Sequence, residues 1–163
     1  MAISGGLDAA PHSVQAWRVA NSPRELPFSV ASFSGIDSGG AMWRAADSRG
    51  TSHALLYVSP TCPHCHAELR RWEAIGKMQP ALLAGLQLVV IVPASIPSSL
   101  RDFLPRTLRI RVVIDADRKL ARSLRVRAVP HVAFVDRELM ARSTSIGQIN
   151  RYRTMANLRT VER

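Results

Sequence analysis

Apolar residues recur along this chain in short blocks whose spacing alternates between that of a strand and that of a helix. Residues 52–60 and 86–95 each hold a continuous apolar run of strand length, which predicts strands buried on both faces of a central sheet. Residues 62–79 carry apolar side chains at helical spacing, and Pro80 follows as a stop. We expect this helix to direct five side chains to the core: Cys65, Leu69, Trp72, Ile75 and Met78.

The segments around these three elements predict smaller ones. Residues 25–33 alternate as a strand, residues 34–40 have turn composition, and residues 41–50 fit either a short strand or a helical turn. Three later strands are expected, at 110–115, 131–136 and 139–148, together with a short helix at 98–105 and a helix at 117–126 that Asp115 or Asp117 opens. A last helix is expected at 150–161, with Asn150 as its cap and with three side chains directed inward: Tyr152, Met155 and Leu158. Strands and helices in alternation predict an α/β layer sandwich.

The chain has 163 residues, of which 47% are hydrophobic, and this suits one globular domain with its own core. We expect an N-terminal arm or linker over residues 1–25 and a single domain over residues 26–163. No run of eighteen apolar residues is present, so we expect no transmembrane helix within the chain. The first residues lack the basic and apolar regions of a signal peptide.

The net charge of +10 comes almost wholly from arginine, and its densest run lies between residues 105 and 130. A basic run of this kind raises the possibility of nucleic-acid binding. Its arginines alternate with aliphatic residues, as on the solvated face of a packed element, and few aromatic residues are available for base stacking. We therefore expect no nucleic-acid partner, and the charge favours an acidic partner or an anionic membrane surface instead.

Cys62 and Cys65 are the only cysteines, and two residues lie between them in the sequence SPTCPHC. Two cysteines do not make a disulfide scaffold, and the small loop between them would stabilise the fold little. Cys62 follows a strand and begins a helix, where free N–H groups and the helix dipole favour a thiolate. Cys65 lies one turn further, on the buried face and within disulfide range. The spacing predicts an exposed attacking thiol and a sheltered resolving thiol.

Three polar neighbours are candidates to tune this pair. His64 lies between the cysteines and is expected either to stabilise the thiolate, which favours the reduced form, or to be a solvent-exposed loop histidine. His66 would add partial charge or point into water. Glu68 shares a helical face with Cys65 and is expected either to carry protons for that thiol or to pair with Arg70 or Arg71 at the surface.

A second candidate element is the proline before the strand at 131–136. Proline cannot donate a hydrogen bond to a neighbouring strand, so Pro130 at this place suits a loop. A cis Val129–Pro130 bond would expose the backbone of Val129, and an extended substrate would pair with it as an added strand. An ordinary trans proline at the start of a strand is the alternative.

These two motifs, in this order, resemble the thioredoxin superfamily. The segment from Leu26 to Leu158 is similar, more narrowly, to the extracytoplasmic TlpA and ResA branch and to MauD proteins. The resemblance implies a thioredoxin-like three-layer sandwich, in which helices flank a central mixed sheet. It also implies an N-terminal extension and an inserted strand and helix, within residues 97–126, before a cis-proline.

The resemblance also implies roles for individual residues. Cys62 matches the nucleophilic cysteine, Cys65 the resolving cysteine, Pro130 the cis-proline and Glu68 an active-site glutamate; with His64 these are the expected catalytic residues. Substrate contacts are expected at Thr61, Pro63, Val129 and Pro130. Three features depart from the pattern: Thr61 replaces a common aromatic residue, the buried aspartate of thioredoxin would fall near Leu56, and the intervening Pro63 and His64 are shared with the oxidant DsbA. The direction of electron flow is therefore open.

The expected function is thiol–disulfide oxidoreductase activity on protein thiols and disulfides, through a Cys62–Cys65 redox couple and without another cofactor. The resemblance implies an extracytoplasmic or periplasmic place, a redox partner protein and a possible membrane tether outside this chain, and we expect a monomer. One alternative is a zinc- or copper-binding module that uses the two cysteines with His64, His66 and His131. A non-catalytic assembly partner with a thioredoxin fold is another.

Overall fold

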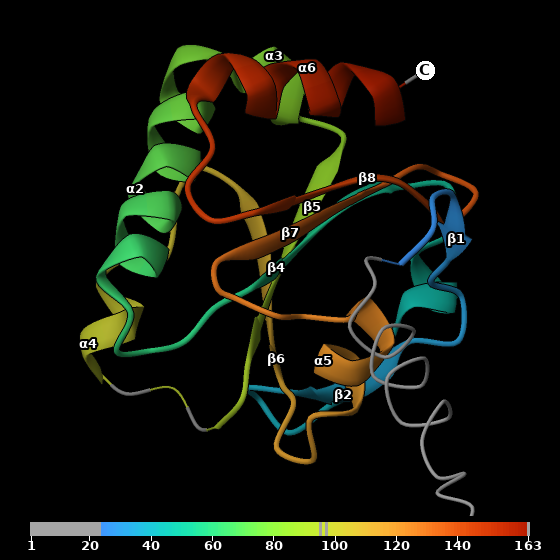
Figure 1. Ribbon diagram of the computed structural model, residues 1–163. Helices are drawn as coiled ribbons and strands as arrows, with labels where there is room; N and C mark the ends of the chain where they lie inside the picture. Colours follow the sequence, from blue (N-terminus) through green and yellow to red (C-terminus); the bar gives the residue numbers. More distant parts are fainter. Residues whose placement is uncertain (1–23, 95, 97, 163) are drawn as a thin grey trace, which may run out of the picture.

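The computed structural model describes residues 24–94, 96 and 98–162, and the predicted arm at 1–25 lies almost wholly outside them. These residues form one eight-stranded mixed sheet in the order β1-β8-β7-β4-β5-β6-β2-β3 (Figure 1). The strands are β1 (Phe28–Ser29), β2 (Ser34–Asp37), β3 (Met42–Arg44), β4 (Ser52–Tyr57), β5 (Leu86–Val92), β6 (Arg109–Ile114), β7 (His131–Val135) and β8 (Met140–Ile146). The helices are η1 (Ala45–Ser48), α2 (Pro63–Met78), α3 (Pro80–Leu83), α4 (Ser98–Arg101), α5 (Lys119–Leu124) and α6 (Arg151–Val161).

The two apolar runs form the middle of the sheet, as predicted. β4 pairs in parallel with β5, and β5 pairs in parallel with β6. On its other edge β4 pairs antiparallel with β7, which continues antiparallel to β8. Every residue of β4 is buried, because helices or chain segments cover both faces of the sheet at this point.

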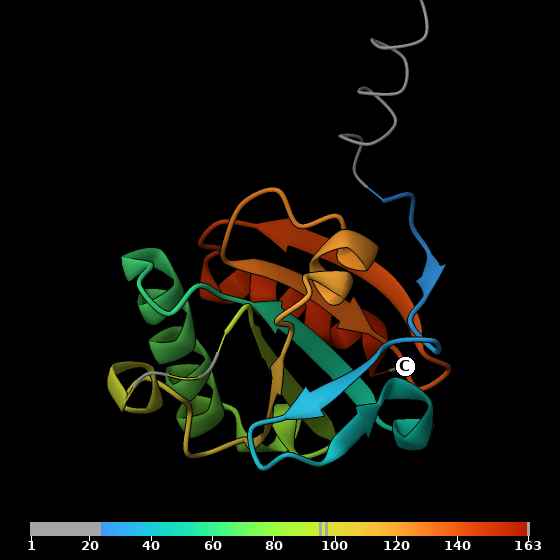
Figure 2. The ribbon, with the colours of Figure 1, turned by 90° about the horizontal axis from the view of Figure 1, so that it is seen from below.

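Three layers result from this arrangement. Helices α2, α3 and α6 cover one face of the sheet, and α5 covers the other, which Figure 2 views from below. Adjacent residues of β4 point to opposite faces, so Leu56 packs with Trp72 of α2 while Leu55 packs in the cluster that contains Leu120 of α5. The predicted three-layer sandwich with a central mixed sheet is confirmed, as are the strand and helix inserted before the proline, β6 and α5.

Helix α2 follows the predicted pattern apart from its last turn. Cys65, Leu69, Trp72 and Ile75 are buried on one face, but Met78 is 50% exposed, so the prediction for this residue was wrong. The helix ends at Met78 with Gln79 as its C-cap, and α3 begins at the next residue. The last turn therefore extends past the edge of the core.

The largest correction concerns residues 25–40. Only Phe28 and Ser29 of the predicted first strand pair with another strand, and Ser34–Asp37, predicted as turn, forms β2. The turn itself is confined to the residues after Asp37, whose Oδ1 accepts hydrogen bonds of 2.9 Å from two backbone N–H groups, those of Gly39 and Ala41. β2 is extended because it pairs with β6 and with β3, the former a contact between segments far apart in the sequence. The ambiguous segment 41–50 holds both β3 and the 3-10 helix η1.

Two helix starts can be compared with their predictions. Asn150 caps α6 as predicted, since its Oδ1 accepts from the backbone N–H of Arg153 at 2.9 Å. Helix α5 has Arg118 at its N-cap position, while the Asp115 carboxylate accepts from the N–H groups of Leu120 and Ala121 at 2.9 Å each. Asp115 thus satisfies the first turn without being the N-cap residue.

The inward face of α6 differs in part. Leu158 is buried as predicted and Met155 is half-buried, but Tyr152 is 67% exposed and that prediction was wrong. Thr154 occupies the buried position of this turn instead, and its hydroxyl donates to the Asn150 carbonyl at 3.2 Å.

None of the helices that the structure describes has the length and the apolar composition needed to span a membrane.

Candidate functional site

The cysteine pair lies where β4 passes into α2. Cys62 is the N-cap of α2 in an extended conformation, and Pro63 occupies the first helical position. The Cys62 carbonyl accepts from the N–H groups of Cys65 and His66 at 3.0 and 3.1 Å, and its Sγ accepts from the Cys65 N–H at 3.4 Å. A half-buried sulfur thus receives a backbone donor at the positive end of a helix. The predicted place of Cys62 at a helix start is confirmed, but its side chain is half-buried and not exposed.

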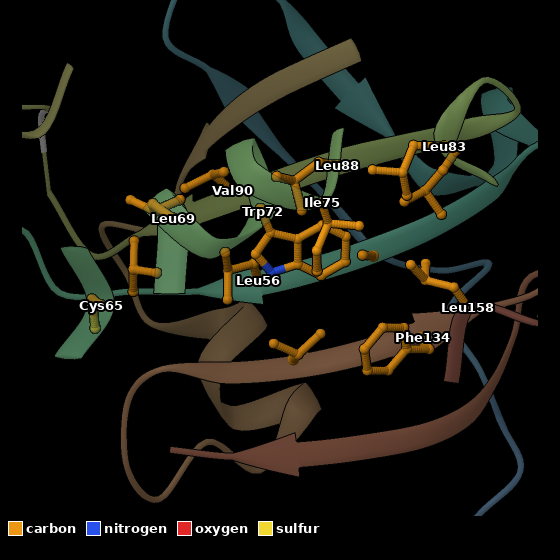
Figure 3. Close-up of a cluster of buried hydrophobic side chains, with 14 of the residues drawn as sticks. Leu56, Cys65, Leu69, Trp72, Ile75, Leu83, Leu88, Val90, Phe134 and Leu158 are labelled. Carbon is orange, nitrogen blue, oxygen red and sulfur yellow. The ribbon is translucent and has the colours of Figure 1, made fainter. Parts of the chain in front are cut away.

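Cys65 has the opposite environment. Its side chain is 0% exposed and lies at one end of the hydrophobic cluster that includes Leu69 and Trp72 (Figure 3). Burial raises the pKa of Cys65 to about 12, with further contributions from its hydrogen bond to Cys62 and from the Glu68 charge. The second thiol is therefore held protonated and sheltered, as the spacing predicted.

Glu68 combines parts of both readings given for it. Its side chain is 0% exposed, so the surface reading was wrong, but it does pair with Arg71, whose guanidinium donates to Oε2. Burial raises the pKa of Glu68, an effect that the nearby Arg71 charge opposes. Hydrogen bonds with the Ile149 backbone and the Trp72 side chain oppose it as well. A buried carboxyl group thus lies within electrostatic reach of the Cys65 thiol.

The two histidines of the motif differ in position. His64 is exposed, and its ring contacts no other described residue through a hydrogen bond or ion pair, so its effect on the thiolate stays a prediction. His66 does not point into water. Its Nε2 lies 2.7 Å from the Pro60 carbonyl, and its ring stacks on Phe103 with 4.1 Å between centroids. No local pattern in the sequence pointed to Phe103, which reaches His66 from the segment after α4.

The loop before β7 lies next to the end of β4. The Val129–Pro130 bond is cis, as predicted, and the register pairs His131 with Tyr57, close to the start of the cysteine motif. Val129 and Cys62 are both half-buried and pack against the same hydrophobic cluster. The N–H and C=O of Val129 make no hydrogen bond with another described backbone group, which leaves them open to an extended chain.

The remaining expected contact residues lie at the surface around the pair. Thr61 and Pro63 are exposed, and the Thr61 hydroxyl lies 3.4 Å from that of Ser59. Leu56 is fully buried, so the carboxylate that thioredoxin carries at this place is absent and Glu68 is the buried carboxyl on the α2 side of the pair. The roles of Thr61 and Pro63 in binding substrate stay predictions.

The described residues give the metal-binding alternative no site, because among them no three His, Cys, Asp or Glu side chains converge on a point that could hold an ion. His131 lies next to Pro130 but is buried, and its two ring nitrogens have no hydrogen-bond partner among the described residues. Burial lowers the pKa of His131 to about 4. This buried neutral histidine was not foreseen, since its burial depends on the packing of β7.

Comparison with known proteins places the chain by its fold. No family model matches the sequence, and no curated protein matches it either. Among solved structures, it is similar to a secreted Mycobacterium tuberculosis disulfide oxidoreductase homologous to E. coli DsbE, with a TM-score of 0.64, 17% identity, and 80% of this chain and 96% of that one covered. The exposed lipoprotein thioredoxin Etrx1 of Streptococcus pneumoniae gives a TM-score of 0.62 and 20% identity, with 78% and 98% covered.

A third similar structure is a putative thiol:disulfide interchange protein DsbE from Chlorobium tepidum. Its TM-score is 0.65 at 16% identity, with 82% of this chain and 98% of that chain covered. The protein has the thioredoxin fold, with a CxxC pair at the start of α2 and a cis-proline before β7. The resemblance to the thioredoxin superfamily is thus confirmed at the level of the fold.

Proposed function

We propose that this protein is a thiol–disulfide oxidoreductase that exchanges disulfides with protein substrates. One observation carries the proposal: a half-buried cysteine caps a helix while its partner, one turn later, is wholly buried with a pKa raised to about 12. Such an asymmetric pair gives one thiol that attacks the substrate and one that stays protonated until it resolves the mixed disulfide. A purely structural pair would have no need of this difference.

The exchange proceeds in two steps. The Cys62 thiolate attacks one sulfur of a substrate disulfide, so that a Cys62–substrate bond forms and the substrate bond breaks, and the departing thiolate takes a proton. Cys65 then loses its proton and attacks the Cys62 sulfur, which releases the second substrate thiol. The substrate gains two electrons and the Cys62–Cys65 pair loses them. Run in reverse, the same steps oxidise a substrate dithiol, and a redox partner protein restores the pair in either direction.

Glu68 is proposed as the group that accepts the Cys65 proton. Its raised pKa and its buried position within electrostatic reach of Cys65 suit proton transfer at a buried thiol. Replacement by glutamine keeps the size of the side chain but cannot accept the proton, so we expect the resolving step to slow by about tenfold to a hundredfold. Stopped-flow decay of the mixed disulfide measures that step, and an unchanged rate would remove Glu68 from the mechanism.

Substrate binding is proposed at the cis-proline loop. The open backbone groups of Val129 suit pairing with an extended segment of the substrate, which would lie across Cys62 beside Thr61 and Pro63. His64 is proposed to stabilise the thiolate from its exposed position between the two cysteines. Pro130 is proposed to shape the loop that receives the substrate.

The location and the oligomeric state are proposed from the similar structures and from the composition of the site. Two similar structures are described as a secreted protein and as an exposed lipoprotein, which supports an extracytoplasmic or periplasmic location. We propose a monomer, because one chain carries both cysteines and the cis-proline loop. A membrane tether, if present, would lie outside the described residues. The couple itself serves as the redox centre.

The test is reduction of a protein disulfide. With dithiothreitol as electron donor, the native chain should reduce insulin, Cys62→Ser should abolish the activity, and Cys65→Ser should accumulate a mixed disulfide at Cys62. Activity retained by Cys62→Ser would overturn the mechanism. Equilibration with glutathione then gives the direction of electron flow. A potential near about −120 mV indicates an oxidant and one near about −270 mV a reductant.

A further inference from the structure

A wide cleft opens beside the candidate active site on the α5 side of the sheet. It has a volume of about 1370 Å³, and its lining runs from Val58 and Ser59 at the end of β4 to Val129 at the cis-proline loop. Ser59 lies three residues before Cys62, and Val129 carries the open backbone groups. A chain segment bound at Val129 would therefore pass into or alongside the cleft.

Arginine dominates the charged part of this lining. Arg118, Arg122 and Arg127, with Arg125, come from the loop before α5, from α5 itself and from the segment leading to β7. We call this feature the arginine cleft. Arg118, Arg122 and Arg127 are exposed, and none of these three forms an ion pair with a described residue. Their charge is therefore available to a ligand.

The Asp115 carboxyl group and the Arg118 guanidinium both form a hydrogen bond with the Tyr57 hydroxyl at the wall of the cleft. Asp115 accepts hydrogen bonds from the Tyr57 hydroxyl at 3.0 Å and from the N–H groups of Leu120 and Ala121. Its oxygens are thus committed to the inner wall, where they hold Tyr57 and the first turn of α5 in place. The Arg122 guanidinium donates a hydrogen bond to the Asp117 carbonyl at 2.7 Å, a neutral acceptor.

We infer that the arginine cleft binds an acidic segment of the protein substrate next to its reacting cysteine. This inference rests on the proposed function, because the acidic segment belongs to the substrate chain that reacts at Cys62. Guanidinium groups recognise carboxylates through paired hydrogen bonds, and like charges gathered along a concave wall attract an acidic chain selectively. The net charge of +10 adds attraction at longer range.

Two other anionic partners fit the cleft less well. Bases of a nucleic acid need exposed aromatic faces, and the one aromatic side chain in the lining, Tyr57, is buried and bonded to Asp115. The arginine cleft is concave, and its lining includes the end of β4. A membrane surface, in contrast, presents its charge on a broad flat layer. An extended acidic segment reaches all three available arginines at once.

The experiment compares two peptide substrates in a single turnover. Each is a homodimer joined by one disulfide, with a self-quenching dye on each half, so that cleavage raises the fluorescence. One peptide carries Asp and Glu on both sides of its cysteine, and the other carries Asn and Gln at the same places. The reduced native chain should cleave the acidic peptide about tenfold faster at low salt, and high salt should bring the two rates together.

Two variants of equal charge locate the effect. In the triple variant Arg118→Gln, Arg122→Gln and Arg127→Gln, the ratio of the acidic to the neutral rate should fall to about one. The matched control replaces three exposed arginines away from the cleft, Arg44, Arg153 and Arg159, by glutamine, and it should keep the ratio of the native chain. A triple variant that keeps the preference, or a control that loses it equally, would overturn the inference.

The same experiment separates this inference from the proposed function. If neither peptide is cleaved, the proposed function fails, and anisotropy of a labelled acidic peptide with serine in place of cysteine then tests binding alone. If both peptides are cleaved at equal rates by the native chain, exchange stands and the acidic preference falls. Tighter binding of duplex DNA or of anionic phosphatidylserine vesicles than of the acidic peptide, lost in the triple variant, would also overturn the inference.

Discussion

The buried position of Cys65 predicts an unreactive thiol even when no partner cysteine remains. In Cys62→Ser, Cys65 is the only thiol, and the charge of Cys62 no longer acts on it. Burial is the first cause of its raised pKa, and burial is unchanged by this substitution. The variant therefore isolates what the hydrophobic cluster alone does to the thiol.

The size of the expected loss of reactivity follows from the pKa of Cys65, which is raised from an ordinary value of 9.0 to about 12. At about pH 8 the thiolate fraction falls from roughly a tenth to roughly 10⁻⁴, a change of about a thousandfold. Loss of the Cys62 contributions in the variant reduces this effect, so we expect iodoacetamide to react with Cys65 at least about a hundredfold more slowly than with a free thiol. Burial of the sulfur slows the reaction further.

Alkylation followed by intact mass spectrometry measures the rate. The control is the same variant unfolded in guanidinium chloride, in which Cys65 should regain the reactivity of a free cysteine. The complementary variant, Cys65→Ser, should react readily at Cys62 in the folded state because that sulfur is half-buried at the helix start. Folded and unfolded rates for Cys65 within about tenfold of each other would refute the assignment of a sheltered resolving thiol.

Three further predictions concern stability. Gly76→Ala should cost about 1–3 kcal/mol in chemical denaturation, because its Cβ would overlap the Thr107 hydroxyl, which is held by Glu73 at 2.9 Å. Gly85→Ala, whose Cβ would lie 3.6 Å from its nearest neighbour, should change little, and equal effects would contradict this packing. The pKa of His131, lowered to about 4 by burial, means that the unfolded chain binds a proton first as pH falls below 6.5, so stability should be lost down to about pH 4. His131→Leu should reduce that acid loss by about 2–3 kcal/mol, and an unchanged acid profile would be inconsistent with a buried neutral ring. As the pH rises above about 9, Cys62→Ser should lose stability relative to the double variant Cys62→Ser, Cys65→Ala by up to about 1.4 kcal/mol per pH unit, because burial keeps the Cys65 proton in the folded state while the unfolded state releases it. Parallel profiles would speak against the raised pKa.

The order of the main elements could be predicted because local signals specify them. Continuous apolar runs identified β4 and β5, helical spacing identified α2, and the place of Cys62 at a helix start followed from the strand before it and Pro63 after it. These signals depend on neighbours in the chain, and such neighbours are visible in the sequence.

Other features depended on contacts between distant segments. β2 was hidden in a segment of turn composition because its strand character comes from pairing with β6, more than seventy residues away along the chain. The burial of Glu68, the stacking of His66 on Phe103 and the neutral state of His131 likewise depend on which surfaces meet.

The sequence alone therefore determined where the pair lies, since a thiol at a helix start and a thiol one turn later need only local geometry. Only the tertiary structure decided what surrounds them. Packing of α2 on the sheet removed Cys65 from water, and the packing of α5 beside the end of β4 placed arginines of the basic run in a cleft next to the cis-proline loop. The physical reason is that ionisation and charge clustering depend on distance through space, which the chain order does not give.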